Sequence, residues 1–264
     1  MSADHETVPG IEVQGLTKAY GPTLANSDVT FKVAPGSAHA LLGENGAGKS
    51  TTMKLLSGLI RPDSGEIRIH GQLVALKSAR DAHARGIQTA FQELTLIPDL
   101  TVLDNMLLPR APWTLFGTLN RTRVRHEVLQ HFDALELDID SDALASELNL
   151  ATRQKIEIAR ALSRNPSVLL LDEPTSALSG EDVEWLGRII AGAKARGITV
   201  LFISHRLPEV RAFCDTMTIL RNGKSVYSSR VDAVTDDEVV ELIIGRSVEN
   251  AFPPRRPVCD RSGE

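Results

Sequence analysis

The 264-residue sequence lacks long apolar runs, contains only two cysteines and is poor in aromatic residues, which make up 4% of the chain. Its longest apolar stretches are only long enough for strands, so no segment is expected to span a bilayer. The first residues carry neither the basic nor the apolar region of a signal peptide. Cys214 and Cys259 have no metal-ligand spacing, which favours reduced structural thiols. These absences predict a protein that is made and kept in the cytoplasm.

A positive net charge is also absent, because acidic residues outnumber basic ones and the net charge is −5. This balance argues against a general nucleic-acid binder, so we expect no nucleic-acid partner. Basic clusters at residues 121–125 and 255–256 are interpreted as a solvated helix face and a polar tail. The hydrophobic content is 42%, and strand-like segments alternate with helical ones, which predicts an α/β fold.

The sequence does contain a complete phosphate-binding loop, because residues 43–50 match the pattern G-x-x-x-x-G-K-[ST]. A strand is predicted before it at 37–42 and an apolar helix after it at 50–59, the context in which such a loop acts. Lys49 would reach the β and γ phosphates, and Ser50 would supply a hydroxyl to Mg²⁺. A chance match in a glycine-rich turn is the alternative. The predicted ATP-binding residues of this segment are Gly43, Glu44, Asn45, Gly46, Ala47, Gly48, Lys49, Ser50 and Thr51.

Two carboxylates follow an apolar run far downstream, where residues 168–171 precede Asp172 and Glu173. The run predicts a strand buried on both faces, whose carboxyl end opens onto the nucleotide site. Asp172 would hold Mg²⁺ through water, and Glu173 would polarise the water that attacks the γ phosphate. The alternative is that both acids lie at a helix N-terminus and are favoured there only by the helix dipole.

A third predicted strand, residues 199–203, runs into Ser204 and His205. A lone histidine after a strand is usually unremarkable. Here a neighbouring strand of the same sheet would deliver the side chain of His205 to the γ phosphate. We therefore predict that it senses or positions that phosphate.

The order of these elements resembles the ATPase subunits of ABC transporters over nearly the whole chain. Tyr20 matches the family's aromatic residue that stacks on adenine, and Gln92 matches the glutamine between the core and the helical lobe. Taken without the family, they would be a turn tyrosine and a strand-end residue. Residues 176–179 match the loop after the second carboxylate, with Ser179 where an aspartate is usual. The resemblance implies a P-loop NTPase fold with a RecA-like core, an antiparallel β subdomain and a helical subdomain.

The resemblance also implies roles for individual residues. Glu173, His205 and Gln92 are the predicted catalytic residues, and Ser50, Gln92 and Asp172 are the predicted metal ligands. ATP and Mg²⁺ are the implied cofactors. The closest likeness is to sugar importers of the ribose and galactose type, on residues 92–98, 101–105 and 203–206. It implies an importer ATPase that lies at the inner face of the cell membrane through transmembrane permease subunits. Its other implied partners are a second ATPase domain and, indirectly, a solute-binding protein.

The family signature L-S-G-G-Q is altered here, because residues 148–152 read Leu-Asn-Leu-Ala-Thr. In this family the signature of one domain closes over the nucleotide held by the other, using a small hydroxyl and bare backbone N–H groups. Asn149 and Ala151 are expected to weaken that contact, which predicts one competent composite site and one weak site. Alternatives are an ATP-binding regulatory or assembly module that rarely hydrolyses ATP, and a soluble ABC ATPase of repair or translation.

The organisation predicted from these patterns is an ATPase domain at 8–247, with a helical subdomain at about 101–163, and a flexible tail or linker at 248–264. Residues 244–254 resemble the linker that precedes a second ATPase domain in fused relatives, so the chain is either a separate half or a fragment. An apolar loop at 111–117 is interpreted as core rather than a docking surface. The other predicted elements are β segments at 11–16, 29–33 and 67–69, a helix at 121–135, a hairpin of 216–220 with 225–228, and a closing helix at 236–244.

Overall fold

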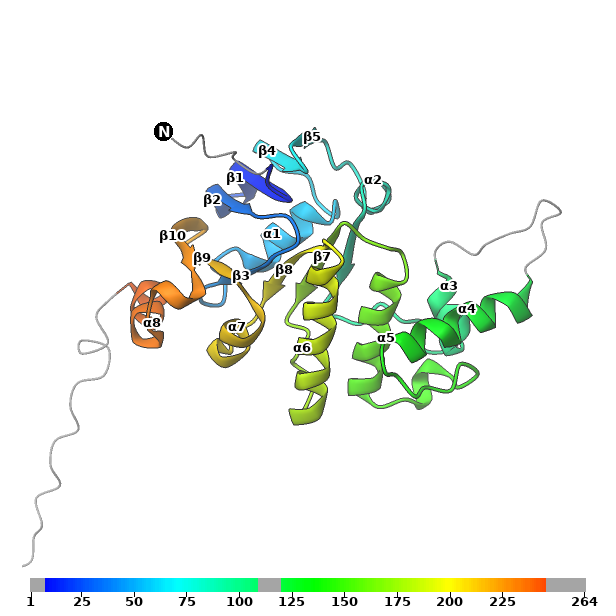
Figure 1. Ribbon diagram of the computed structural model, residues 1–264. Coiled ribbons are helices and arrows are strands. Elements are labelled where there is room, and N and C mark those ends of the chain that lie inside the picture. Colours follow the sequence, from blue (N-terminus) through cyan, green and yellow to red (C-terminus); the bar gives the residue numbers. More distant parts are fainter. Residues whose placement is uncertain (1–7, 109–119, 246–264) are drawn as a thin grey trace, which may run out of the picture.

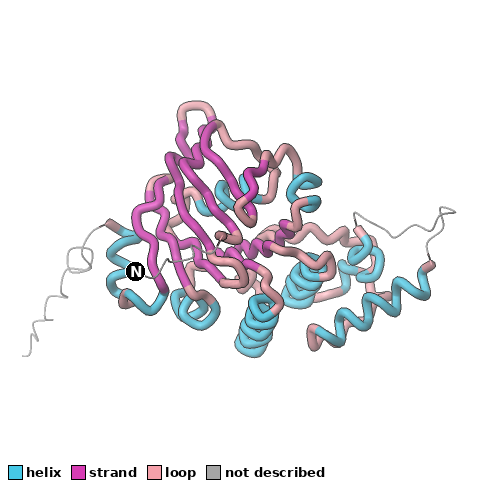
Figure 2. The backbone as a smooth tube through the Cα atoms, turned by 45° about the horizontal axis from the view of Figure 1, so that its top comes forward, coloured by secondary structure: helices cyan, strands magenta, loops and turns pink. Residues whose placement is uncertain are grey.

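The computed structural model describes residues 8–108 and 120–245, which form two β-sheets and the helices that cover them (Figure 1). One sheet has the strand order β10-β9-β3-β8-β7-β6, and the other has the order β2-β1-β4-β5. Figure 2 shows the strands gathered on one side of the molecule and most of the helices on the other.

The larger sheet contains the strand that leads into the phosphate loop. Its strands are β3 (Ala38–Leu42), β6 (Ile87–Ala90), β7 (Val168–Asp172), β8 (Thr199–Ile203), β9 (Thr216–Arg221) and β10 (Lys224–Arg230). All pairs are parallel except β9 with β10. Side chains of β7 alternate between two apolar cores, with Leu169 and Leu171 on one face and Leu170 on the other. A strand buried on both faces explains the unbroken apolar run in the sequence.

The smaller sheet is antiparallel, and its buried side chains pack in one apolar cluster with those of α1 (Lys49–Leu56), the helix after the phosphate loop. Its strands are β1 (Ile11–Tyr20), β2 (Thr23–Val33), β4 (Ser64–Ile69) and β5 (Gln72–Val74). The backbone N–H of Ser27 donates to the carbonyl of Gly223 at 2.7 Å, which ties β2 to the turn between β9 and β10. In that turn Asn222 and Gly223 have φ values of 51° and 76°, as the tight hairpin predicted from Asn-Gly requires.

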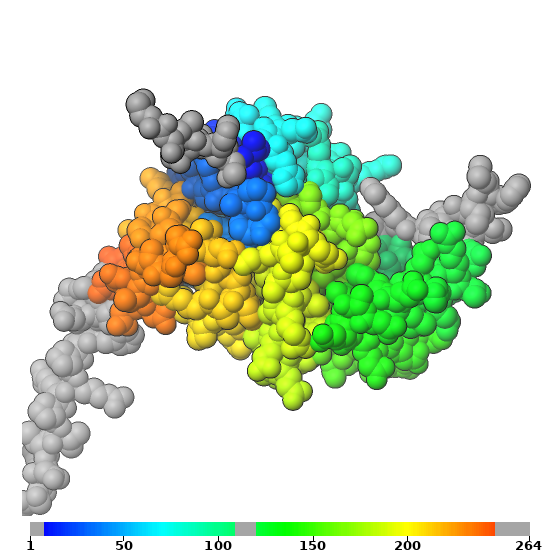
Figure 3. Space-filling model, in the orientation of Figure 1, coloured from blue at the N-terminus to red at the C-terminus, as the bar shows by residue number. Residues whose placement is uncertain are grey.

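Helices cover the open faces of the larger sheet. Their bounds are α1 (Lys49–Leu56), α2 (Ala79–Ala84), α3 (Val102–Leu107), α4 (Arg121–Ala134), α5 (Leu150–Leu162), α6 (Gly180–Ala195), α7 (Leu207–Phe213) and α8 (Asp236–Ile244). In Figure 3 the green segment around α4 and α5 forms one end of the molecule, and the orange C-terminal elements form the other. Among the described residues, no helix is long and apolar enough to cross a membrane.

Most predicted elements are confirmed, and the differences lie at their ends. The helix expected at 50–59 begins at Lys49 and ends at Leu56. It does not continue through Gly58, which has φ +72° and where a Cβ would lie 2.4 Å from the Ser78 carbonyl oxygen. The segments expected at 11–16 and 29–33 are parts of longer strands. Strands β5 and β6 and helices α2, α6 and α7 were not predicted. All of them except the 16-residue α6 are short and carry little periodic signal.

The region expected to be mostly helical, 101–162, is helical in α3, α4 and α5 but not between α4 and α5. Residues 135–149 contain only the short 3-10 turn Ala145–Glu147, and an isolated bridge joins Thr101 to Leu144. The subdomain bounds stay predictions. The expectations for the 111–117 loop, for Cys259, for Arg255 and Arg256 and for the 248–264 tail lie outside the described residues.

Candidate functional site: a phosphate loop facing the ends of two neighbouring strands

The phosphate loop connects β3 to α1. At two of its positions, Gly43 and Gly48, the backbone passes so close to a neighbouring strand that only glycine fits. A Cβ atom on Gly43 would lie 2.3 Å from the carbonyl oxygen of Leu220, and one on Gly48 would lie 2.7 Å from that of Ala25. Both residues have positive φ, at 146° and 101°. The loop is therefore held against two strands on one side, and its other side faces a cavity.

Lys49 is buried at 7% exposure, and its ammonium group donates to the carbonyls of Gly43 and Glu44 at 2.8 and 2.9 Å. Burial lowers its pKa, and the carboxylates of Glu173 and Asp172 act in the opposite direction. These carboxylates lie close enough to affect the charge of Lys49, although more than 120 residues separate them in the sequence. The loop and the acids after β7 therefore belong to one site.

A cavity of about 790 Å³ brings ten of the predicted site residues together. They are Tyr20, Asn45, Gly46, Gly48, Lys49, Ser50, Thr51, Gln92, Glu173 and His205. Gly43, Glu44 and Ala47 complete the loop without lining the cavity, and Asp172 ends β7, which β8 separates from β3. The structure thus gathers residues from five separate segments, and their individual roles remain predictions.

Some contributors were not predicted from the sequence. Thr23, Leu24 and Ala25, at the start of β2, line the same cavity. Asn26 is fully buried behind them, and its amide donates to Thr52 Oγ1 at 2.9 Å and to the carbonyl of Gly48 at 3.3 Å. No motif marks these residues, because their contribution depends on the pairing of distant strands.

Asp172 is buried at 7% exposure, and its Oδ1 atom has no hydrogen-bond partner within the described residues. The pKa of this carboxyl is raised to about 6, mainly by burial and to a smaller extent by the nearby charge of Glu173. A buried carboxylate oxygen without a donor suits a hard divalent cation, either directly or through water. Ser50 lines the nucleotide cavity, and Asp172 lies close enough to affect the charge of Lys49 there. A carboxylate and a hydroxyl at this site form a donor set that fits Mg²⁺.

Glu173 and His205 face each other at the cavity edge. Glu173 Oε2 lies 3.6 Å from His205 Nδ1, which is longer than a direct hydrogen bond. Glu173 adopts φ +46°, an uncommon backbone for a residue with a side chain, and its N–H donates to the carbonyl of Ile203 at 3.0 Å. The helix-start alternative for the two acids is wrong, because Asp172 ends β7 and the next helix begins at Gly180.

The altered signature lies at the start of α5. Asn149 caps this helix, and its side-chain oxygen accepts from the backbone N–H of Thr152 at 2.8 Å. One N–H group at the helix start is therefore already used within the chain. Leu150 adds an apolar side chain that is 59% exposed.

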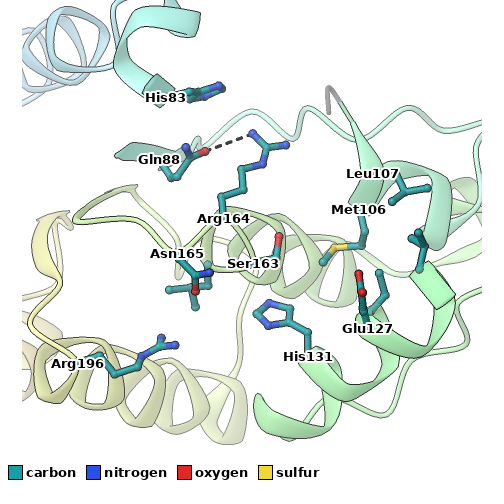
Figure 4. A pocket seen from close by; sticks show the side chains of 13 residues that line it. His83, Gln88, Met106, Leu107, Glu127, His131, Ser163, Arg164, Asn165 and Arg196 are labelled. Carbon is teal, nitrogen blue, oxygen red and sulfur yellow. Dashed lines mark hydrogen bonds between the residues drawn. The ribbon is translucent and has the colours of Figure 1, made fainter. Parts of the chain in front are cut away.

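A second cavity, of about 540 Å³, lies at the end of the larger sheet where strands β6, β7 and β8 begin (Figure 4). Its lining includes Gln88 near the start of β6, Asn165 just before β7 and Arg196 just before β8. The phosphate loop follows the other, carboxyl end of its strand. This cavity is therefore separate from the nucleotide site.

The fold and the loop define a P-loop nucleotide-binding protein of the α/β class. Residues 26–176 match the family model described as ABC transporter, and the chain belongs to this family. The predicted ABC-type ATPase fold is confirmed by solved structures. The ADP conformation of MJ1267, an ATP-binding cassette of an ABC transporter, has a TM-score of 0.78 at 26% identity and covers 91% of this chain and 100% of that one.

Two further relatives bear on assembly and substrate. A dimeric structure of a post-hydrolysis state of the ATP-binding cassette MJ0796, bound to ADP and Pi, has a TM-score of 0.75 at 26% identity and covers 84% of this chain and 98% of that one. The ribose import ATP-binding protein RbsA of Rhodococcus jostii (strain RHA1) is 42% identical over 246 residues, which are 93% of this chain and 49% of that protein. The chain spans about half the length of the curated relatives it matches.

Replacing Asp172 with Asn is expected to stabilise the free chain near neutral pH. The folded-state pKa near 6 exceeds the ordinary 3.8, so this carboxyl favours folding below about pH 4, and its contribution is lost as the pH rises through 6. At about 1.4 kcal/mol per pKa unit, the substitution should raise the free energy of unfolding by about 1–3 kcal/mol at neutral pH. Urea unfolding without Mg²⁺ measures this. A gain that is equally large at about pH 4 would contradict the assignment.

Proposed function

We propose that this chain is an ATP-hydrolysing subunit that energises an ABC importer for a sugar or similar small polar solute. The observation that carries the proposal is the single cavity shared by the phosphate loop, Gln92, Glu173 and His205. Similarity to the ribose import ATP-binding protein of Rhodococcus jostii supports the solute class.

Each group of this chain has a distinct task in the proposed reaction. Tyr20 stacks on the adenine, the loop N–H groups surround the phosphates, and Lys49 neutralises the β and γ oxygens. Glu173 orients and polarises the attacking water, and His205 holds the γ phosphate. Ser50, Gln92 and Asp172 would hold Mg²⁺, which would supply charge neutralisation at the transferred phosphate.

The proposed assembly places two ATPase domains face to face, with a heterodimer favoured, on transmembrane permease subunits. Closure on ATP would be passed to the permease through the Gln92 region, and hydrolysis would reset the domains. The protein would then lie at the cytoplasmic face of the membrane, with a solute-binding protein acting through the permease. We propose residues 8–247 as the ATPase domain, with the helical subdomain at about 101–163.

The asymmetry of the proposed assembly predicts that a repaired signature increases turnover. Asn149→Ser with Ala151→Gly should raise the ATPase rate of the chain as a homodimer by about tenfold or more, because a small hydroxyl and bare N–H groups can approach the partner's γ phosphate. Asn120→Ser is the matched control, since Asn120 caps α4 in the same way, through a bond from Arg123 N–H at 3.1 Å. Rapid ATP turnover by the unmodified homodimer would contradict the predicted weak site.

A second candidate function is an ATP-binding regulatory module with little hydrolysis. The capped and altered signature at Asn149 favours it, and the cavity that holds Glu173 and His205 counts against it. The importer ATPase would hydrolyse ATP rapidly within the assembled complex, whereas the regulatory module would bind ATP with little turnover.

The proposal is tested by measuring the ATPase activity of the chain alone and then mixed with a partner ATPase domain and permease subunits from neighbouring genes. Activity that requires the mixture supports the importer motor. Tight ATP binding without turnover in any mixture would favour the regulatory module.

A further inference from the structure

We infer that Glu209 is a positioning residue for hydrolysis, because its carboxylate joins the loop that carries Glu173 to the loop that carries His205. This inference rests on the proposed function for its catalytic meaning. Glu209 lies on α7 and is 6% exposed. Its Oε2 atom accepts hydrogen bonds from Thr175 Oγ1 at 2.8 Å and from Ser204 Oγ at 2.7 Å. One carboxylate oxygen thus bridges two segments of the site.

The bonds to Glu209 lie just beyond the carboxyl ends of β7 and β8, where the pairing of the two strands ends. β7 and β8 are paired up to Asp172 and Ile203. Thr175 comes two residues after Glu173, and Ser204 immediately precedes His205. Beyond the last strand pair, the backbone bond from the Glu173 N–H to the Ile203 carbonyl and the contacts made by the two loops set the separation of Glu173 and His205. Glu209 supplies a contact to each loop from a common atom.

The network around Glu209 is buried and closely bonded. Thr175 and Ser204 are 3% and 2% exposed. Ser204 Oγ also accepts from the backbone N–H of Arg206 at 3.0 Å, and Arg206 Nη1 lies 3.4 Å from Glu209 Oε1. A buried carboxylate is costly unless it is bonded, whereas a satisfied network of this kind is rigid. The network can therefore hold the two loops in a fixed relation.

Glu209 acts through other residues rather than on the nucleotide. Among the described residues, Glu173 and His205 line the nucleotide cavity, whereas Glu209, Thr175 and Ser204 do not. Loss of the bridge should therefore lower kcat in the assembled transporter and leave the KM for ATP nearly unchanged. A change in the phosphate loop would instead alter nucleotide binding.

The experiment compares variants that differ only in the bridge. Glu209→Gln keeps a side-chain oxygen that can accept hydrogen bonds from the hydroxyls of Thr175 and Ser204, whereas Glu209→Met removes that oxygen. Thr175→Ser keeps a hydroxyl, whereas Thr175→Val removes it at similar shape. We expect Glu209→Met and Thr175→Val each to lower kcat by about tenfold, with most activity retained by the two conservative variants. The double variant Glu209→Met with Thr175→Val should be little worse than either alone.

Hydrogen exchange of the chain gives a readout that does not depend on turnover. Glu209→Met and Thr175→Val should speed exchange in both 173–178 and 204–206, with the phosphate loop unchanged. If exchange changes only within α7, or if kcat is unaffected, the positioning role is wrong. If Glu209→Met does not fold, the Thr175 pair decides. An assembly in which even the unmodified chain shows no turnover contradicts the proposed function, while exchange still decides whether Glu209 couples the loops.

Discussion

Glu173→Gln is expected to abolish ATP turnover in the proposed importer complex, with a loss of about 10²–10⁴-fold, while nucleotide binding is retained. The amide keeps the size of the side chain but cannot polarise water as a carboxylate does. Its loop should stay in place, because the Glu173 N–H bond to Ile203 is made by the backbone. The charge of Glu173 raises the pKa of Asp172, so its removal should also ease ionisation of Asp172. We therefore expect unchanged or tighter binding of the nucleotide with Mg²⁺.

The measurements are ATPase rates in the complex and nucleotide binding by the chain alone. Glu181→Gln is the matched control, because Glu181 is an exposed acid in the first turn of α6. It should leave both readouts unaltered. Normal turnover by Glu173→Gln would remove the catalytic role, and a parallel loss of binding would indicate damage to the fold instead.

The core of the site could be predicted because its signals are local. The loop pattern, the apolar run before Asp172 and the strand before His205 each identify a strand end within a few residues. Parallel strands of one sheet bring such ends together, so residues 43–50, Glu173 and His205 were expected to meet. The cavity brings them together as the topology requires.

What could not be predicted depends on contacts between distant segments. Asn26 supports the loop only because β2 lies beside α1, and its own sequence surroundings carry no motif. Glu209 looks like an ordinary acid in a short helix until the bonds from Thr175 and Ser204 are seen. The cap at Asn149 likewise fits any helix start, and only the family signature makes it notable.

Lys49→Ala is expected to weaken ATP binding by about 10–100-fold. A charge-assisted bond contributes about 1.5–3 kcal/mol, and each 1.4 kcal/mol is tenfold in affinity. The Lys49 ammonium group donates to the loop carbonyls of Gly43 and Glu44. It also counters the negative charges of Asp172 and Glu173. Its removal should leave phosphates without that cation and raise the pKa of Asp172 further, since Lys49 lowers it.

Equilibrium binding of ATP, ADP and adenosine separates this effect from general damage. The loss should be large for ATP and ADP and small for adenosine, because the proposed contact of Lys49 is with the phosphates and that of Tyr20 is with the base. Lys54→Ala is the matched control, since Lys54 lies exposed on the same helix, and it should bind ATP nearly as well as the unmodified chain. An equal loss for adenosine would mean that the substitution disturbs the cavity as a whole, and unchanged ATP affinity would mean that the loop N–H groups suffice without the ammonium charge.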